Sequence, residues 1–106
     1  IHSDEPAKEL TILDLRLIPE RFAAERNGTE ITLTLKEFRL LETLARYPDR
    51  IFTKEQLYRI VWEDEWLKDE NVINVTISRL REKIELGDGP PKYIITVWGI
   101  GYRAGK

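Results

Sequence analysis

The segment from Asp69 to Leu86 holds the side chains of this chain that are best suited to contact another molecule. Its large apolar residues recur at the spacing of one buried helical stripe: Ile73, Ile77, Leu80 and Ile84. At about 100° per residue, the positions opposite that stripe hold Asn71, Val75, Ser78 and Glu82. The flanking positions hold Val72, Thr76 and Arg79 on one side, and Asn74 and Arg81 on the other. The segment therefore predicts an amphipathic helix.

The outer face of this helix combines short amides, hydroxyls, a valine and two arginines, where a solvated face is usually rich in Glu and Lys. Arginine pairs with guanine, asparagine pairs with adenine, and small apolar groups contact thymine methyls in the major groove of DNA. The mixture favours a helix that enters this groove. On this segment alone, a plain amphipathic helix with incidental β-branched residues stays open as the alternative.

Both ends of the predicted helix have recognisable signals. Asp69 is a suitable N-cap, and Glu70 lies in the first turn, where the helix dipole favours a negative charge. Gly87 and the following Asp88-Gly89-Pro90-Pro91 predict the stop. We therefore expect the helix to run from Asp69 to Leu86.

The composition is that of one globular domain. The chain has 106 residues, of which 42% are hydrophobic and 34% charged. No apolar run approaches the roughly 18 residues of a membrane span. The absence of cysteine excludes disulfides, a thiolate nucleophile and a zinc-finger pattern, and it fits a cytosolic protein. Because the first residue is not Met, we expect a fragment or a processed chain.

The charge is unevenly distributed along the chain. Residues 1–70 hold 11 Lys/Arg and 16 Asp/Glu, a net charge of −5, whereas residues 71–106 hold 6 and 3, a net charge of +3. Such asymmetry suggests a basic working end on an acidic body. The overall charge of −2 is otherwise a weak argument against a nucleic-acid partner.

The first half of the chain predicts a scaffold. Residues 1–9 are polar and contain the one histidine, His2, so we interpret them as the remnant of a linker that precedes a domain of residues 10–106. Short β-like pieces follow, and they predict a four-stranded antiparallel sheet: Leu10–Leu13, Arg16–Ile18, Arg21–Ala24 and Glu30–Leu33. Asn27-Gly28 is a strong hairpin signal between the last two.

Two capping boxes then open two helices. Thr34 with Glu37 begins a helix that ends near Tyr47, and its expected apolar stripe is Leu35, Phe38, Leu41, Leu44 and Ala45. Thr53 with Gln56 begins a helix to about Trp62, with Leu57, Ile60 and Val61 expected to face inward.

The C-terminal residues predict a β-hairpin. Residues 93–98 alternate as a strand, Gly99-Ile100-Gly101 forms a turn, and residues 102–104 return. The second and third helices then form a helix-turn-helix variant with a long turn, and the hairpin lies beside them as a wing. The predicted fold is thus an α+β winged helix-turn-helix with an N-terminal sheet.

Three stretches of this order and spacing resemble the OmpR/PhoB family of bacterial response-regulator effector domains. They are residues 33–41 (LTLKEFRLL), 74–83 (NVTISRLREK) and 93–103 (YIITVWGIGYR). The resemblance covers residues 8–104, and the combination of the second and third stretches is highly specific. It implies a winged helix whose third helix enters the major groove and whose wing lies along the adjacent minor groove.

The resemblance also implies roles for individual residues. Arg79 would be the main base-contacting side chain, and Val72 and Val75 would touch base edges or thymine methyls. Positions that lie against phosphates match Trp62, Asn71, Thr76, Ser78, Arg81, Thr96 and Tyr102. This chain departs from some members at Asn71, Thr76 and Ser78, where they have Arg or His. Trp98 stands where others place the wing arginine.

Each of these residues also has a structural interpretation. Tyr102 and Trp98 could belong to the core of the hairpin, and Arg81 could form a surface ion pair with Glu85. Thr96 could be an ordinary strand residue. Arg79 has no structural role of this kind. Without a contact to DNA, it would be a surface arginine that has no partner.

The resemblance implies partners as well. The parent protein would have an N-terminal receiver domain that is phosphorylated, and effector domains would bind direct repeats of double-stranded DNA head to tail. We expect the isolated domain to be monomeric. In the family, the loop matching Glu63, Asp64, Glu65, Trp66 and Leu67 touches RNA polymerase in some members. A solvated connector is the equal alternative for this loop.

Two other functional classes were compared with DNA binding. A winged helix used as a protein-interaction module fits the acidic body, but not the matched polar residues of the third helix and wing. An enzyme has little support, because there is no Cys, no glycine-rich phosphate loop and no paired carboxylates on a rigid face. Glu63-Asp64-Glu65 lacks the spacing of a calcium loop. No metal and no cofactor are expected.

Overall fold

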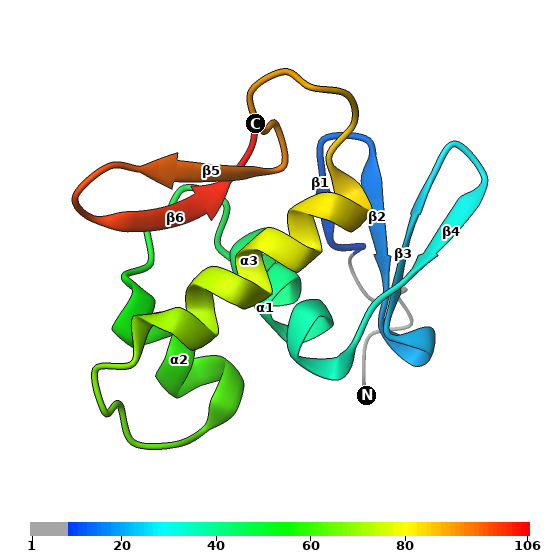
Figure 1. The fold of residues 1–106 in the computed structure, drawn as a ribbon. Helices are drawn as coiled ribbons and strands as arrows, with labels where there is room; N and C mark the ends of the chain where they lie inside the picture. The colour runs from blue at the N-terminus through cyan, green and yellow to red at the C-terminus, as the bar shows by residue number, and fades with distance from the viewer. Residues whose placement is uncertain (1–8) are drawn as a thin grey trace, which may run out of the picture.

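The computed structural model describes residues 9–106, so His2 and most of the expected linker lie outside the described residues. The elements follow the predicted order of sheet, three helices and hairpin (Figure 1). They are β1 (Thr11–Ile12), β2 (Leu15–Ile18), β3 (Ala23–Arg26), β4 (Thr29–Thr32), α1 (Leu35–Arg46), α2 (Lys54–Trp62), α3 (Glu70–Ile84), β5 (Ile94–Val97) and β6 (Gly101–Ala104). The predicted α+β winged helix-turn-helix is confirmed.

The N-terminal sheet is an antiparallel meander in the order β1-β2-β3-β4. Arg26 pairs with Thr29 across Asn27 and Gly28, whose φ angles are +52° and +82°, as a two-residue hairpin turn requires. The third strand runs over Ala23–Arg26, so the predicted Arg21–Ala24 is wrong by two residues. A 3₁₀ turn at Pro19–Arg21, followed by Phe22 in a left-handed conformation, takes up the beginning of the predicted strand.

Both predicted capping boxes are present. In each, the threonine hydroxyl accepts from the backbone N–H three residues later, and the side chain at that position accepts from the threonine N–H. The N–H of Thr34 lies 2.8 Å from Oε1 of Glu37, and the N–H of Thr53 lies 2.9 Å from Oε1 of Gln56. These local signals therefore fix the beginnings of α1 and α2.

Two residues predicted to face the core are exposed instead. Leu35 is 43% exposed because it occupies the first position of α1, ahead of the turns that pack against the body. Ile60 is 45% exposed, since the short α2 buries Leu57 and Val61 and packs Tyr58 and Trp62 partly against the core, on the side away from Ile60. Leu40, which the predicted stripe omits, is fully buried.

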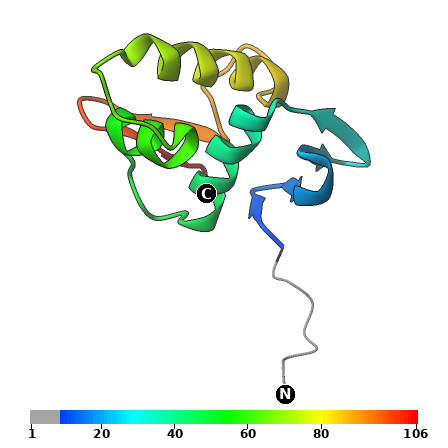
Figure 2. The same ribbon diagram turned by 90° about the horizontal axis from the view of Figure 1, so that it is seen from below.

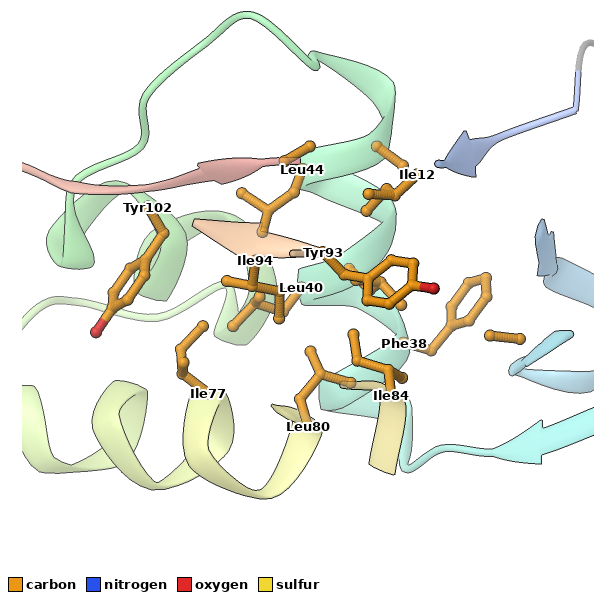
Figure 3. Packing of buried hydrophobic residues seen from close by; sticks show 14 of the residues in the cluster. Ile12, Phe38, Leu40, Leu44, Ile77, Leu80, Ile84, Tyr93, Ile94 and Tyr102 are labelled. Atoms are coloured by element: carbon orange, nitrogen blue, oxygen red, sulfur yellow. The ribbon is translucent and has the colours of Figure 1, made fainter. Parts of the chain in front are cut away.

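The predicted stripe of α3 is confirmed in full. Ile73, Ile77, Leu80 and Ile84 are at most 3% exposed. Figure 3 shows Ile77, Leu80 and Ile84 pointing from α3 toward side chains of α1 and the wing, including Leu40 and Ile94. Burying four such side chains contributes on the order of 1.5–3 kcal/mol each, so packing fixes the rotation of α3 and leaves its opposite face outward. Figure 2 shows α3 at the outer edge of the molecule.

The end of α3 differs from the prediction by two residues. The helix ends at Ile84, and Glu85 adopts an extended conformation with φ −78° and ψ 144°. The Glu85 carboxylate accepts from the N–H groups of Lys92, Tyr93 and Ile94 at 2.7, 3.0 and 3.1 Å. These bonds to the beginning of the wing replace a continued helix, so Gly87 lies in the loop rather than at the cap.

The wing is joined to the body through β6. Tyr102 and Phe52 exchange backbone hydrogen bonds of 2.9 and 2.8 Å, which adds the α1–α2 connection to the edge of β6. Gly101 is required beside this bridge, because a Cβ there would lie 1.9 Å from the Phe52 carbonyl oxygen. Tyr102 pairs with Thr96 one residue before the turn, so the bridge fixes β6 close to the turn, and the turn residues 98–100 lie beyond it (Figure 1).

Candidate nucleic-acid interface

The outer face of α3 is solvent-exposed where the sequence predicts it. The exposed residues are Asn71, Asn74, Val75, Ser78, Arg79 and Glu82. Val72 and Thr76 are half-buried, and the Thr76 hydroxyl donates to the Val72 carbonyl at 2.8 Å within the helix. Val75 is an unusual exposed residue, at 42% of its surface. The face thus presents small and polar groups with one apolar side chain among them.

Arg79 is exposed on this face, and within residues 9–106 it makes no ion pair or hydrogen bond. Other arginines of the body are matched. Arg16 pairs with Glu25 at 2.7 Å, and Arg21 pairs with Glu30 at 3.1 Å. The guanidinium of Arg79 therefore has its donors available for a partner outside the domain.

Arg81 lies against the wing instead of solvent. Its Nη2 donates to the Ile94 carbonyl at 2.7 Å and to the Thr96 hydroxyl at 2.8 Å. The guanidinium also lies over the Tyr102 ring, 5.7 Å from its centroid. The expected ion pair of Arg81 with Glu85 is wrong, because the Glu85 carboxylate binds the wing backbone.

A shallow open groove runs between α3 and the wing. It is lined by Asn74, Ile77, Ser78, Arg81, Glu82 and Tyr102. Tyr102 is 7% exposed and is part of the core, as its structural interpretation predicts. Trp98 is 89% exposed, so its interpretation as hairpin core is wrong. The structure therefore places Arg81 in contact with Thr96 and Tyr102, while Trp98 at the wing tip lines a neighbouring hollow together with Thr96 and Tyr102.

Trp62 is held at the end of α2 by an aromatic cluster. Its ring stacks on Tyr58 with centroids 5.3 Å apart, and Trp66 contacts the same tyrosine edge-on at 5.4 Å. Nζ of Lys36 lies 5.7 Å from the Trp62 ring centroid and donates to the Val61 carbonyl. Sequence reasoning missed Lys36. A lysine in the first turn of α1 gives no signal that it will reach α2.

The loop after α2 divides into exposed and packed residues. Glu63 ends the helix in a left-handed conformation and pairs with Arg39 at 3.5 Å. Asp64 and Glu65 are exposed, Trp66 packs against the core, and Leu67 is 79% exposed. Three acids and one leucine of this loop are thus accessible to a partner, although Glu63 also pairs with Arg39.

An ion pair between an exposed lysine and a buried carboxylate joins α3 to α1. Nζ of Lys83 lies 2.6 Å from Oε1 of Glu37, which is 3% exposed. Burial raises the pKa of Glu37, but the hydrogen bonds from Lys83 and from the Thr34 N–H outweigh it, so the pKa is lowered below its ordinary value. The pair therefore joins the beginning of α1 to the end of α3 in its charged form.

The N-terminal sheet also contacts the end of α3. Nη1 of Arg26 donates to the Ile84 carbonyl at 2.6 Å, where the helix leaves its last carbonyls without partners. The same guanidinium lies over the Tyr93 ring at 5.5 Å, and the Tyr93 hydroxyl donates to the Asp14 carboxylate. Burial and this bond to Asp14 raise the pKa of Tyr93. Sheet, α3 and wing therefore meet at one junction.

The described part of the chain lacks the features of two other kinds of site. Residues 9–106 contain no group of three or more His, Cys, Asp or Glu side chains that could hold a metal ion. Among the helices of the same residues, none combines the length and the apolar character that crossing a bilayer would need.

Comparison with known proteins identifies several relatives. The family model described as "Transcriptional regulatory protein, C terminal" matches residues 28–104. The chain is 44% identical over 98% of its length to YcbL of Bacillus subtilis, described as an uncharacterized transcriptional regulatory protein, and covers 47% of it. It is 40% identical over 98% of its length to the DNA-binding response regulator MtrA of Mycobacterium tuberculosis, and covers 46% of it.

Solved structures agree with these relatives. The DNA-binding domain of CpxR from E. coli superposes with a TM-score of 0.79 at 28% identity, over 93% of this chain and 97% of that one. The chain spans about half the length of the curated relatives that it matches.

Proposed function

This chain belongs to the OmpR/PhoB-type family of effector domains, the C-terminal part of two-component transcriptional regulators, and we propose how its surface binds specific double-stranded DNA. The exposed face of α3 enters the major groove, whose width of about 12 Å accepts a helix of about 10–12 Å. The observation that carries this proposal is Arg79, which is exposed and unmatched within residues 9–106.

Base contacts come from the centre of this face. Arg79 donates two hydrogen bonds to O6 and N7 of a guanine, the commonest specific contact in the major groove. Val75 and Val72 contact base edges or thymine methyls. This contact explains why Val75 is 42% exposed on a helix whose isoleucine and leucine side chains are buried.

Phosphate contacts surround these residues. They come from Trp62, Asn71, Thr76, Ser78, Arg81, Thr96 and Tyr102. Arg81 uses Nη2 to hold the wing, and its Nη1 makes no hydrogen bond to another described residue, so this atom is the one that reaches a phosphate. One side chain thereby positions the wing and contributes to affinity.

The remaining proposals concern the whole regulator. An N-terminal receiver domain, joined through a linker that includes residues 1–9, controls the domain of residues 10–106 by phosphorylation in the bacterial cytoplasm. Two effector domains occupy a direct repeat head to tail. The exposed loop residues Glu63, Asp64, Glu65 and Leu67 contact RNA polymerase. The domain has no catalytic activity or cofactor of its own.

Selection of bound duplexes from a random pool tests the proposal. We expect enrichment of one motif that contains a guanine, with a dissociation constant that rises steeply with salt. Binding that shows no preference for any sequence, or no binding at low salt, would overturn the proposal and favour a winged helix that binds protein.

A further inference from the structure

The tip of the wing exposes two large apolar side chains. Trp98 is 89% exposed and Ile100 is 55% exposed. They lie on one β-turn, in which the Ile100 N–H donates to the Val97 carbonyl at 2.9 Å. Gly99 has a φ of +79°, as the third residue of a type II turn requires. The two side chains are thus held close together at the end of the hairpin.

The tip is presented by a fixed hairpin. The Phe52–Tyr102 bridge holds β6 on the body, and Arg81 holds β5 on α3 through the Ile94 carbonyl and the Thr96 hydroxyl. The tip therefore cannot fold back to cover Trp98 without breaking bonds at both strands. An apolar surface displayed in this way usually marks a contact site.

The chemistry of the tip is apolar and uncharged. From Ile94 to Ala104 the only charged residue is Arg103, which is half-buried and donates to the Ala104 carbonyl at 2.9 Å. Beside the hairpin, Lys54, Glu55 and Glu70 line the same hollow as Trp98 and Ile100, and Nζ of Lys54 lies 2.9 Å from the Glu70 carboxylate. The lysine next to the tip therefore already has a carboxylate partner. Apolar side chains contact DNA through the sugars of the minor groove or by entering between two base pairs.

We propose that Trp98 and Ile100 form an apolar wedge, which enters the minor groove next to the major groove occupied by α3 and partly unstacks one base step. The inference rests on the proposed function and is continuous with its surface, since Arg81 and Thr96 join α3 to the same hairpin. The wedge favours pyrimidine–purine steps such as TA or CA at that position, because these unstack most easily. The bound DNA is bent at the step.

Three variants and one duplex test the wedge. The selected duplex has end labels for energy transfer, which report the bend, and 2-aminopurine at the step under the wing. We expect Trp98→Ala to lower affinity by about 5- to 100-fold, the range for stacking of a base on an aromatic ring. The bend and the 2-aminopurine signal are lost, and the salt dependence stays unchanged because no charge is removed. Trp98→Phe retains most of each signal.

A matched control lies elsewhere on the surface. Leu13 is 45% exposed in the turn between β1 and β2, so Leu13→Ala removes an apolar group without touching the wedge and leaves affinity, bend and fluorescence unchanged. Trp98→Arg keeps the position but replaces stacking by charge. We expect a salt dependence steeper by about one phosphate contact and no 2-aminopurine signal.

The outcomes separate the two proposals. If the native domain selects a motif and Trp98→Ala, folded by circular dichroism, binds and bends it unchanged, the wedge is excluded while DNA binding stands. This result would assign the tip to a protein partner. If the native domain binds no duplex, the proposed function fails together with the wedge.

Discussion

Nη2 of Arg81 lies 2.8 Å from Oγ1 of Thr96, and this bond joins α3 to the first strand of the wing. Just after the end of α3, the carboxylate of the C-cap residue Glu85 accepts from the backbone N–H groups of residues 92–94. One side chain of α3 and one at its C-cap therefore hold the beginning of the wing. The two elements that we propose to contact DNA are thereby fixed relative to each other before binding.

We call the bonds from Arg81 to β5 the clamp, and removing the Thr96 hydroxyl, one of its two acceptors, tests it. Thr96→Val deletes one bond to a charged donor but leaves the Ile94 carbonyl, so we expect the free energy of unfolding to fall by about 1 kcal/mol. Arg81→Ala should cost more and should also lower the salt slope of DNA binding by about one unit. A double-mutant cycle measures the coupling, expected at about 0.5–1.5 kcal/mol. Additive effects of the two substitutions would show that the clamp contributes nothing.

Arg79 is expected to determine sequence preference. Arg79→Ala should weaken specific binding by roughly 1–3 kcal/mol and relax the preference at one base position of the selected motif. Arg46→Ala is the control, because Arg46 is an exposed arginine at the far end of α1. An unchanged motif for Arg79→Ala would assign base recognition to other residues.

The ion pair of Lys83 with the buried Glu37 carboxylate predicts that the folding stability of the domain falls in acid. The pKa of Glu37 is lowered in the folded state from an ordinary value of 4.5. Its contribution to stability is therefore complete above about pH 4.5 and is lost as the pH falls through the folded-state pKa. Glu37→Gln keeps the cap but removes the charge, so we expect a loss of about 1–2 kcal/mol at pH 7 and a shallower fall in acid. Chemical denaturation between pH 3 and 7 measures both.

The chain provides a matched control for this substitution. Gln56 occupies the same place in the second capping box, without a lysine partner among the described residues. Gln56→Glu should therefore change stability by less than about 0.5 kcal/mol. Equal pH profiles of Glu37→Gln and the native domain would contradict the assigned role of the ion pair.

The loop after α2 predicts a separation of binding from activation. The double substitution Asp64→Lys with Glu65→Lys replaces two exposed negative charges and leaves the Arg39–Glu63 pair in place. It should abolish activation of transcription in vitro. The affinity for duplex DNA should stay equal or rise, because repulsion of the phosphates is removed. Glu9→Lys with Glu20→Lys adds the same charge on the N-terminal sheet and serves as the control. Normal activation by the loop variant would make the loop a connector.

Two copies should bind a direct repeat with centres about 10–10.5 bp apart. Inserting five base pairs places the second copy on the opposite face of the duplex, so cooperative binding should disappear, and inserting ten should place it on the original face again. Binding isotherms for the three spacings measure the cooperativity. Equal cooperativity at all spacings would exclude direct contact between the copies.

Local chemistry explains what the sequence predicts well. The capping boxes, the Asn27-Gly28 hairpin and the stripe of α3 each depend on residues close in the chain, and each is found in the structure. The errors arise where the local conformation depends on residues that are distant in the chain. Glu85 ends α3 because its carboxylate binds residues 92–94, and the orientation of Arg81 depends on the Ile94 carbonyl and Thr96. The exposure of Trp98 likewise depends on how the wing joins the body.

The Phe52–Tyr102 bridge has a consequence for the order of folding. It closes a segment of about 50 residues, whereas α1, α2 and α3 form from contacts within single turns, so the entropy of loop closure delays the wing. We therefore expect the wing to dock last and to detach first when the domain is destabilised. A partly unfolded chain would keep its helices but would bind DNA more weakly, because its wing would be detached.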